Sequence, residues 1–121
     1  MDDEEMVREV TGEMLKELGY EVAFARDGVE AIERYLQGLQ SGRSFDMVIL
    51  DLTVPGGMGG REAMERLLRI DPAVVGIVTS GYSDDPIMAH YREYGFKGMV
   101  SKPFRLASLG ATISEVLAQM S

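Results

Sequence analysis

The chain has 121 residues, of which 45% are hydrophobic, 20 acidic and 12 basic, with a formal net charge of −8. This length suits one domain with a buried core, and the hydrophobic content excludes a disordered chain. The acidic balance disfavours direct binding to nucleic acid or to an anionic membrane, and no apolar run is long enough to span a bilayer. Without cysteine there is no disulfide and no thiolate metal site, and we expect a cytoplasmic protein.

Apolar periodicity predicts helices and strands that alternate along the chain. Residues 4–18 are expected to form a helix, because an apolar residue recurs at every fourth position from Met6 to Leu18, and Gly19 to end it. The elements predicted after it are a strand at 21–25, a helix capped by Asp27, a strand at 46–50, a helix that carries Ala63 to Leu68, a strand at 73–79, a helix from Pro86 to Tyr94 with Ser83, Asp84 and Asp85 as cap residues, a strand at 98–101 and a helix from Leu106 to Met120. This alternation indicates one α/β domain over residues 1–121, with a parallel sheet and helices on both of its faces.

Charged residues follow two of the predicted strands. Asp51 comes directly after the apolar run at 47–50, which is typical of a strand buried on both faces. Its carboxylate is expected at the carboxyl edge of the sheet, where open α/β folds place ligands. Asp2 and Asp3 add two acids at the start of the chain, and Lys102 follows another apolar strand. Acids and a lysine at strand ends predict a metal-assisted site for phosphoryl chemistry.

Taken in order, these motifs resemble the receiver domain of two-component response regulators. The motifs are Asp2-Asp3-Glu4, Asp51 with Pro55 four residues later, Ser80-Gly81 after an apolar strand, and Lys102-Pro103-Phe104. Each motif alone is common by chance, whereas the ordered set is specific and covers essentially the whole chain. The stretches 56–60 and 80–86 resemble, more narrowly, the receivers of hybrid sensor histidine kinases. The resemblance implies a flavodoxin-like, doubly wound fold and a phosphoacceptor function in a phosphorelay.

The resemblance also implies a donor and a cofactor. Asp51 is expected to accept a phosphoryl group from a sensor histidine kinase or a histidine phosphotransfer domain, after which the chain signals by a conformational change. The implied cofactor is Mg²⁺ or Mn²⁺, since hard divalent ions take oxygen ligands. The implied metal ligands are Asp3 and Asp51 directly, Asp2 through water, and the backbone carbonyl of Thr53.

The same resemblance implies roles for two further residues. Lys102 is expected to pair with the phosphoryl oxygens, and Ser80 to hydrogen-bond the phosphate and report its presence. Thr79 is the rival of Ser80, which we prefer because Gly81 follows it and because alternating side chains turn Thr79 to the opposite face. Met99 stands where the family often has an aromatic residue, so the aromatic half of the usual switch pair is missing.

One departure from the family concerns the start of the fold. Only Met1 precedes Asp2, so the apolar first strand of the family, which is internal in its strand order, is expected to be missing. Four or five buried aliphatic side chains contribute roughly 6–15 kcal/mol, which matches the whole stability of a domain, about 5–15 kcal/mol. The explanations are a sequence cut short at this strand, a second copy that closes the gap, or rearranged strands. The energy comparison favours a homo-oligomer.

Three other functions compete with a phosphoacceptor. A truncated receiver that is not phosphorylated would act as a protein–protein interaction or oligomerisation module. A phosphohydrolase with an aspartyl-phosphate intermediate usually carries a second acid two residues after the nucleophile, where this chain has Thr53. Only slow self-dephosphorylation at Asp51 is therefore expected. A flavodoxin-like cofactor binder would need a phosphate-binding loop after its first strand, and none is evident.

Overall fold

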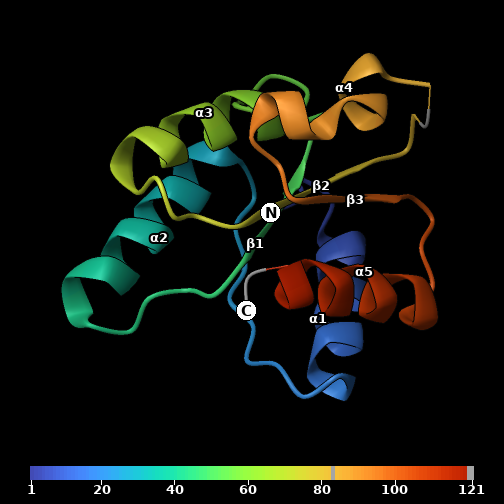
Figure 1. The fold of residues 1–121 in the computed structure, drawn as a ribbon, viewed down its shortest axis with the longest axis horizontal. Helices are drawn as coiled ribbons and strands as arrows, with labels where there is room; N and C mark the ends of the chain where they lie inside the picture. Colours follow the sequence, from blue (N-terminus) through green and yellow to red (C-terminus); the bar gives the residue numbers. More distant parts are fainter. Residues whose placement is uncertain (83, 120–121) are drawn as a thin grey trace.

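The computed structural model describes residues 1–82 and 84–119, and Figure 1 shows its elements. In chain order they are α1 (Glu5–Glu17), α2 (Gly28–Ser41), β1 (Val48–Asp51), α3 (Gly60–Ile70), β2 (Gly76–Ser80), α4 (Pro86–Ala89), the 3-10 helix η1 (Tyr91–Tyr94), β3 (Gly98–Ser101) and α5 (Leu106–Gln119). Ser83 and Met120, which the sequence places in a helix cap and in the last helix, lie outside the described residues. No helix in the described part of the chain is long and apolar enough to cross a membrane.

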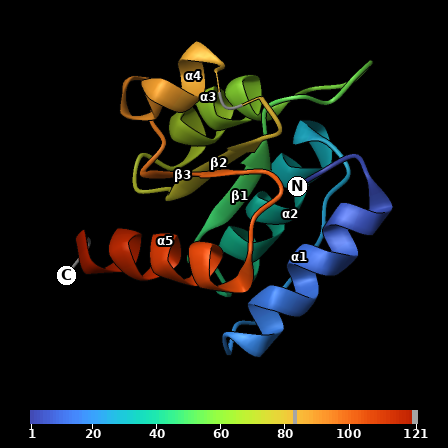
Figure 2. The same ribbon diagram turned by 90° about the vertical axis from the view of Figure 1, so that its right-hand side faces the viewer.

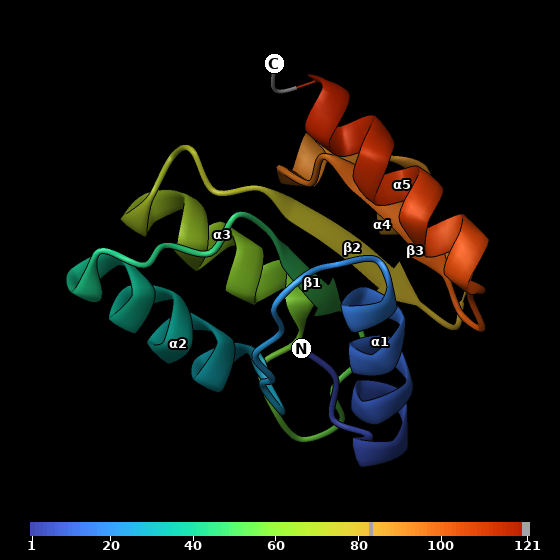
Figure 3. The same cartoon turned by 90° about the horizontal axis from the view of Figure 1, so that it is seen from below.

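The sheet of the described residues is parallel and has the strand order β1-β2-β3. Helices α1 and α5 cover one face, and α2, α3 and α4 cover the other (Figures 2 and 3). Ile49 and Ile77 point into the core beneath α1 and α5, while Leu50 and Val78 point into the core beneath α2 and α3. The α/β architecture with helices on both faces of a parallel sheet is therefore confirmed.

Local signals in the sequence define several helix ends. Asp27 caps α2, because its side chain accepts a hydrogen bond from the Glu30 N–H at 2.9 Å. Asp85 caps α4 in the same way, through the Ile87 N–H, and proline occupies the first turn. The chain leaves α1 through Gly19, whose φ of 95° suits glycine. These caps agree with the ends predicted from the sequence.

Two elements differ from the prediction. Residues 21–25 are not a strand: they run as an irregular segment whose one backbone hydrogen bond within the described residues joins the Ala25 carbonyl to Asp2. A strand needs a paired neighbour, and this segment has none along most of its length. The helix predicted from Pro86 to Tyr94 is divided into α4 and η1 at His90, which has a non-helical φ of −121° and ψ of 39°. So short a segment, with Met88 as the buried side chain of α4, has few contacts that enforce a regular helix.

Met1 and Asp2 lie beside the free edge of β1. The Met1 amino group donates to the Ile49 carbonyl at 2.6 Å, and the Asp51 N–H donates to the Met1 carbonyl at 3.1 Å. On its other side this short stretch is bonded to Ala25, whose carbonyl accepts from the Asp2 N–H at 3.1 Å. These hydrogen bonds mark the position, beside β1, that a strand ahead of Asp2 would occupy. That such a strand is missing, and that a second copy replaces it, stay predictions.

Tyr35 links α2 to the end of α3, and its replacement is expected to destabilise the fold. Its side chain is 4% exposed and its hydroxyl donates to Asp71 Oδ2 at 2.6 Å. We expect Tyr35→Phe to lower the free energy of unfolding by about 1–2 kcal/mol. This is the usual contribution to stability of a hydrogen bond to a partly exposed charged group. Urea denaturation measures this loss, with the exposed Tyr20 changed to Phe as the control.

The same pair predicts a pH dependence. Burial, together with the hydrogen bond and the charge of Asp71, raises the pKa of Tyr35. A raised pKa means that the stabilisation is fully present below the unfolded tyrosine pKa of about 10 and is lost as the pH rises above it. Denaturation of the wild-type chain above this pH should therefore show a stability loss that Tyr35→Phe lacks. Equal losses in both proteins would contradict the prediction.

Candidate functional site

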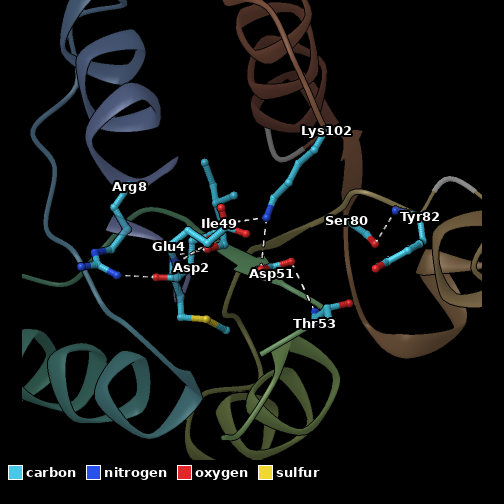
Figure 4. Close-up of polar contacts among 10 residues, drawn as sticks. Asp2, Glu4, Arg8, Ile49, Asp51, Thr53, Ser80, Tyr82 and Lys102 are labelled. Atoms are coloured by element: carbon cyan, nitrogen blue, oxygen red, sulfur yellow. Dashed lines mark hydrogen bonds and ion pairs between the residues drawn. The ribbon is translucent and has the colours of Figure 1, made fainter. Parts of the chain in front are cut away.

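The carboxyl edge of the sheet gathers two of the predicted acids, Asp2 and Asp51, and the predicted lysine, as Figure 4 shows. Asp51 is the last residue of β1 and is 3% exposed, and Asp2 lies beside it at 5% exposure. Lys102 follows β3 and comes from a point 100 residues further along the chain than Asp2. Parallel strands end at a common edge, and this brings Asp51 and Lys102 together. Asp2 is placed beside them by the backbone hydrogen bonds that Met1 makes with β1.

Lys102 bridges the two buried carboxylates. Its Nζ lies 2.5 Å from Asp2 Oδ2 and 3.2 Å from Asp51 Oδ2. The three side chains are between 4% and 18% exposed, so little water screens their charges. The site thus holds a compact group of two acids and one base, in which the lysine compensates part of the negative charge.

Burial sets the protonation behaviour of these groups. Burial raises the pKa of the Asp51 carboxyl above its ordinary value, although Lys102 and the hydrogen bond from Thr53 oppose the rise. For Lys102, burial alone would lower the pKa, but the hydrogen bond to Asp2 and the charges of Asp51 and Asp2 outweigh it, so the pKa is raised. Burial lowers the pKa of the Met1 amino group to about 6. Lys102 therefore carries its charge at neutral pH, beside a carboxylate that is costly to ionise.

The acids also form a set that suits a divalent ion. Asp2, Asp3 and Asp51 each offer a carboxylate oxygen, and these oxygens all lie within 4.8 Å of one another. Asp2 and Asp51 are buried while Asp3 is exposed, so the set opens towards solvent on one side. Three carboxylate oxygens match the preference of Mg²⁺ and Mn²⁺ for hard oxygen ligands. The residues therefore fit the ion that the sequence implies.

Thr53 lies at the entrance of the loop after β1. Its N–H donates to Asp51 Oδ1 at 3.3 Å, which fixes one oxygen of the predicted phosphoacceptor. The role of its carbonyl as a metal ligand stays a prediction. Beyond it, Gly59 packs against this loop so closely that a Cβ there would meet the Leu52 carbonyl oxygen at 2.4 Å. The shape of the loop therefore depends on a position without a side chain.

A methyl group at Gly59 is expected to disturb this loop. Because the obstacle is backbone and not the end of a flexible side chain, we expect Gly59→Ala to cost about 1–3 kcal/mol of stability through overpacking. Thermal denaturation measures the loss. Gly81→Ala is the matched control, since nothing lies within 4 Å of a Cβ at Gly81. Equal stability of the two variants would show that the loop yields without cost.

Ser80 and Thr79 both lie at the end of β2. The register pairs Asp51 with Thr79, so these two side chains leave the sheet on the same face, whereas Ser80 pairs with Ser101. Ser80 is fully buried, and its Oγ accepts a hydrogen bond from the Tyr82 N–H at 3.0 Å (Figure 4). Thr79 Oγ1 is buried without a hydrogen-bond partner in the described chain. The role of Ser80 as the phosphate contact stays a prediction, with Thr79 as its rival.

The structure adds contacts of Asp2 that sequence reasoning did not identify. Arg8, from the first turns of α1, donates through Nη1 to the Asp2 carbonyl at 2.8 Å. The Glu4 N–H donates to Asp2 Oδ1 at 3.0 Å. Both hydrogen bonds hold Asp2 where Lys102 meets it. An arginine near the start of an acidic helix is too common a pattern to have revealed this role.

The comparisons with known proteins all point to one protein family. A family model of the response regulator receiver domain matches residues 1–114. The chemotaxis protein CheY of Thermotoga maritima is 29% identical over 117 residues, which cover 96% of this chain and 92% of CheY. The sensor kinase CckA of Brucella abortus is 32% identical over 97% of this chain but 12% of the kinase. A cyclic di-GMP phosphodiesterase of Thermotoga maritima is 28% identical over 97% of this chain and 30% of its own length. The chain thus spans less than a third of two of these relatives.

Solved structures share the whole fold. A two-component response regulator of the LuxR family from Aurantimonas sp. SI85-9A1 has a TM-score of 0.84 and 29% identity, over 98% of this chain and 81% of that one. The response regulator TrrA of Thermotoga maritima, solved in complex with Mg²⁺-BeF, has a TM-score of 0.80 and 27% identity, over 95% and 93% of the two chains. With an acidic cluster and a lysine at the carboxyl edge of a parallel sheet, this chain belongs to the response regulator receiver domains of two-component signal transduction.

Proposed function

We propose that the chain is a phosphoacceptor that takes a phosphoryl group onto Asp51 from the phosphohistidine of a sensor histidine kinase or a histidine phosphotransfer domain. The observation that carries this proposal is the buried Asp51 carboxylate, with Lys102 Nζ at 3.2 Å and two further acids beside it. A carboxylate is a weak nucleophile, but a phosphoramidate is a reactive donor. The site therefore has to supply mainly position and compensation of charge.

The transfer exchanges one bond to phosphorus for another. A carboxylate oxygen of Asp51 forms the new O–P bond while the P–N bond of the donor breaks. The imidazole nitrogen keeps the electron pair of that bond, and the ring takes up one proton from solvent to leave as neutral histidine. The Thr53 N–H holds Asp51 Oδ1 at 3.3 Å, which leaves the other oxygen for attack. Lys102 offers its positive charge to the phosphoryl oxygens on the same side of the site. Its hydrogen bond to Asp2 and its ion pair with Asp51 orient it before the donor arrives.

We propose Mg²⁺, or Mn²⁺, as the cofactor, held by Asp3 and Asp51 directly, by Asp2 through water and by the Thr53 carbonyl. When bound, the ion neutralises negative charge on the phosphoryl oxygens. The three carboxylates within 4.8 Å of one another support this assignment, as does the relative TrrA, which was solved in complex with Mg²⁺-BeF.

We further propose that Ser80 reports the phosphoryl group through a conformational change, and that the chain acts in the cytoplasm. Ser80 Oγ now accepts a hydrogen bond from the Tyr82 N–H, so a turn of the hydroxyl towards phosphate would release the segment that follows β2. Self-dephosphorylation is expected to be slow, because Thr53 stands two residues after Asp51 and has no carboxylate to activate water. The resemblance to hybrid kinase receivers agrees with the similarity to the sensor kinase CckA.

Intact-mass spectrometry after incubation with acetyl phosphate tests the proposal. We expect a gain of one phosphoryl group in the presence of Mg²⁺, no gain in EDTA, and removal of the group by hydroxylamine, which cleaves an acyl phosphate. A gain that resists hydroxylamine would place the phosphoryl group on another kind of residue. No gain with a folded protein and excess Mg²⁺ would contradict the proposal and favour an interaction module that is not phosphorylated.

A further inference from the structure

The hydroxyl group of Thr79 is unusual among the buried polar groups of this chain. Within residues 1–82 and 84–119, Thr79 Oγ1 is the buried side-chain oxygen that has no hydrogen-bond partner. The residue lies in β2 and is 3% exposed. A buried hydroxyl without a partner opposes folding, whereas valine has nearly the same shape and leaves nothing unpaired. Stability alone therefore does not account for a threonine at this position.

The side chain of Lys102 crosses the strand that carries this hydroxyl. Strand β2 lies between β1 and β3, and Lys102 follows β3. Its Nζ nevertheless lies 3.2 Å from Oδ2 of Asp51, which ends β1, and Figure 4 shows the lysine pointing towards this carboxylate. Because β2 separates the two residues, the lysine side chain passes over the end of β2.

The register places Thr79 on the face of the sheet that Lys102 crosses. Thr79 is the β2 partner of both Asp51 and Val100, and paired residues of parallel strands turn their side chains to one face. Lys102 comes two residues after Val100, so alternation gives it the same face. The Lys102 N–H donates to the Ser80 carbonyl at 2.8 Å, which continues the ladder past β3. The Ser80 side chain points to the opposite face, so Thr79 is the β2 side chain beneath the lysine.

The ammonium group of Lys102 has three N–H donors, and its acceptors change when a phosphoryl group arrives. In the free chain the oxygens beside it are Asp2 Oδ2 and Asp51 Oδ2. Formation of an acyl phosphate removes the negative charge of the Asp51 carboxylate, and one N–H of Lys102 then turns to the phosphoryl oxygens. Asp2 accepts a second N–H, which leaves the third without an acceptor among the acids.

We propose that Thr79 Oγ1 accepts this third N–H of Lys102 and so holds the ammonium group in place for phosphoryl transfer. The proposal rests on the phosphoacceptor function proposed above. Thr79 is then a positioning residue, which acts through Lys102 and does not touch the phosphoryl group. Rotation about χ1 alone moves Oγ1 between staggered positions, so the strand does not have to shift. Without this acceptor the ammonium group is held less precisely, and transfer slows.

The variants Thr79→Val and Thr79→Ser separate the hydroxyl from the packing of the side chain. Phosphoryl uptake from acetyl phosphate at saturating Mg²⁺ should be at least about tenfold slower in Thr79→Val and within about threefold of the wild type in Thr79→Ser. Thr79→Val should unfold at the same or a higher urea concentration, because it removes an unpaired buried hydroxyl. Thr112→Val, at a half-buried position on α5, is the control and should react as the wild type does. Uptake by Thr79→Val at the wild-type rate would overturn the inference.

Exchange of the lysine ammonium protons, measured by NMR, reports the hydrogen bond itself. The sample contains Mg²⁺ and fluoroberyllate, which takes the place of a phosphoryl group on a carboxylate. We expect the Lys102 ammonium protons to exchange at least about tenfold faster in Thr79→Val than in the wild type, and Thr79→Ser to restore the slow exchange. Lys16, whose side chain is 59% exposed, and the exposed Lys97 are internal controls that should not change. Equal exchange of Lys102 in Thr79→Val and the wild type would contradict the proposed contact.

A double-mutant cycle with Lys102→Met shows whether Thr79 acts through the lysine. In the Lys102→Met background, Thr79→Val should leave the rate of phosphoryl uptake unchanged. A further tenfold loss in that background would mean that Thr79 meets the phosphoryl group itself, and it would refute a positioning role. If the wild type and Thr112→Val also take up no phosphoryl group, the phosphoacceptor function fails and the role of Thr79 fails with it. Normal uptake by every Thr79 variant refutes the role of Thr79 alone.

Discussion

Replacement of Asp51 by asparagine is expected to abolish phosphoryl uptake from acetyl phosphate. Asparagine keeps the shape of the side chain and its acceptor for the Thr53 N–H, but its amide has no nucleophilic oxygen of comparable strength. Since burial raises the pKa of the Asp51 carboxyl, the folded chain favours a neutral group at this position, and Asp51→Asn should fold at least as well as the wild type. Intact-mass spectrometry measures the uptake, and urea denaturation confirms the fold.

The matched control for this prediction is Asp46→Asn, which changes an exposed aspartate just ahead of the same strand. It should take up one phosphoryl group as the wild type does. Asp51→Asn should also bind Mg²⁺ at least about tenfold more weakly, because one of the three carboxylates is lost. Undiminished uptake by Asp51→Asn would place the phosphoacceptor elsewhere and refute the assignment of the site.

Replacement of Lys102 by methionine is expected to destabilise the metal-free chain strongly. The change leaves Asp2 and Asp51, both buried, without the ammonium group that lies 2.5 Å and 3.2 Å from them. Loss of one partner from a buried ion pair costs about 3–5 kcal/mol. Urea denaturation in EDTA measures this cost, and Lys97→Met, at an exposed position, is the control that should change stability little.

The pH dependence of this variant has a definite sign. Without Lys102, the pKa of the Asp51 carboxyl, already raised by burial, rises further. A carboxyl with a raised pKa contributes stability below its unfolded pKa, about 3.9, and that contribution is lost as the pH rises through the folded pKa. The deficit of Lys102→Met should therefore be small at about pH 4 and grow towards neutrality. A deficit that is constant with pH would show that packing of the lysine stem, and not charge, is what stabilises the site.

Divalent ions should relieve part of this deficit. An ion that binds only the folded state adds about 2.7 kcal/mol of stability at a concentration of one hundred times its Kd. Because the ion takes over the compensation of the acids, Mg²⁺ should stabilise Lys102→Met more than it stabilises the wild type. Phosphoryl uptake should nevertheless stay slower in the variant, since the charge that faces the phosphoryl oxygens is gone. Equal effects of Mg²⁺ on both proteins would argue against an ion among these carboxylates.

Sequence reasoning succeeded where the signal is local or is fixed by topology. The apolar run that ends in Asp51 forms β1, and the one that precedes Lys102 forms β3. The strand ends differ little from the predicted ones. Because parallel strands share a carboxyl edge, two residues at the ends of such strands could be expected to meet, although many residues separate them in the chain. The ion pair of Lys102 and Asp51 at 3.2 Å agrees with that expectation.

Sequence reasoning failed at residues 21–25, and the reason is general. A run of apolar residues describes what a strand can bury, but a strand exists only when a neighbour pairs with its hydrogen-bonding groups. Here Ala25 finds such a neighbour in Asp2, and the residues before it do not. The choice between Ser80 and Thr79 could not be made from the sequence for a similar reason. The face of the sheet to which a side chain points depends on the register with β1, which pairs Thr79 with Asp51.

The sequence by itself determined the α/β class, the helix caps at Asp27 and Asp85, and the set of acids and lysine from which the site is made. These features depend on periodicity, on capping chemistry and on strand ends, which a single segment encodes. Only the tertiary structure decided that Lys102 bridges Asp2 and Asp51 and that a largely apolar cavity lies beside the free edge of β1. Each of these features joins segments far apart in the chain, and its geometry follows from how the helices pack on the sheet.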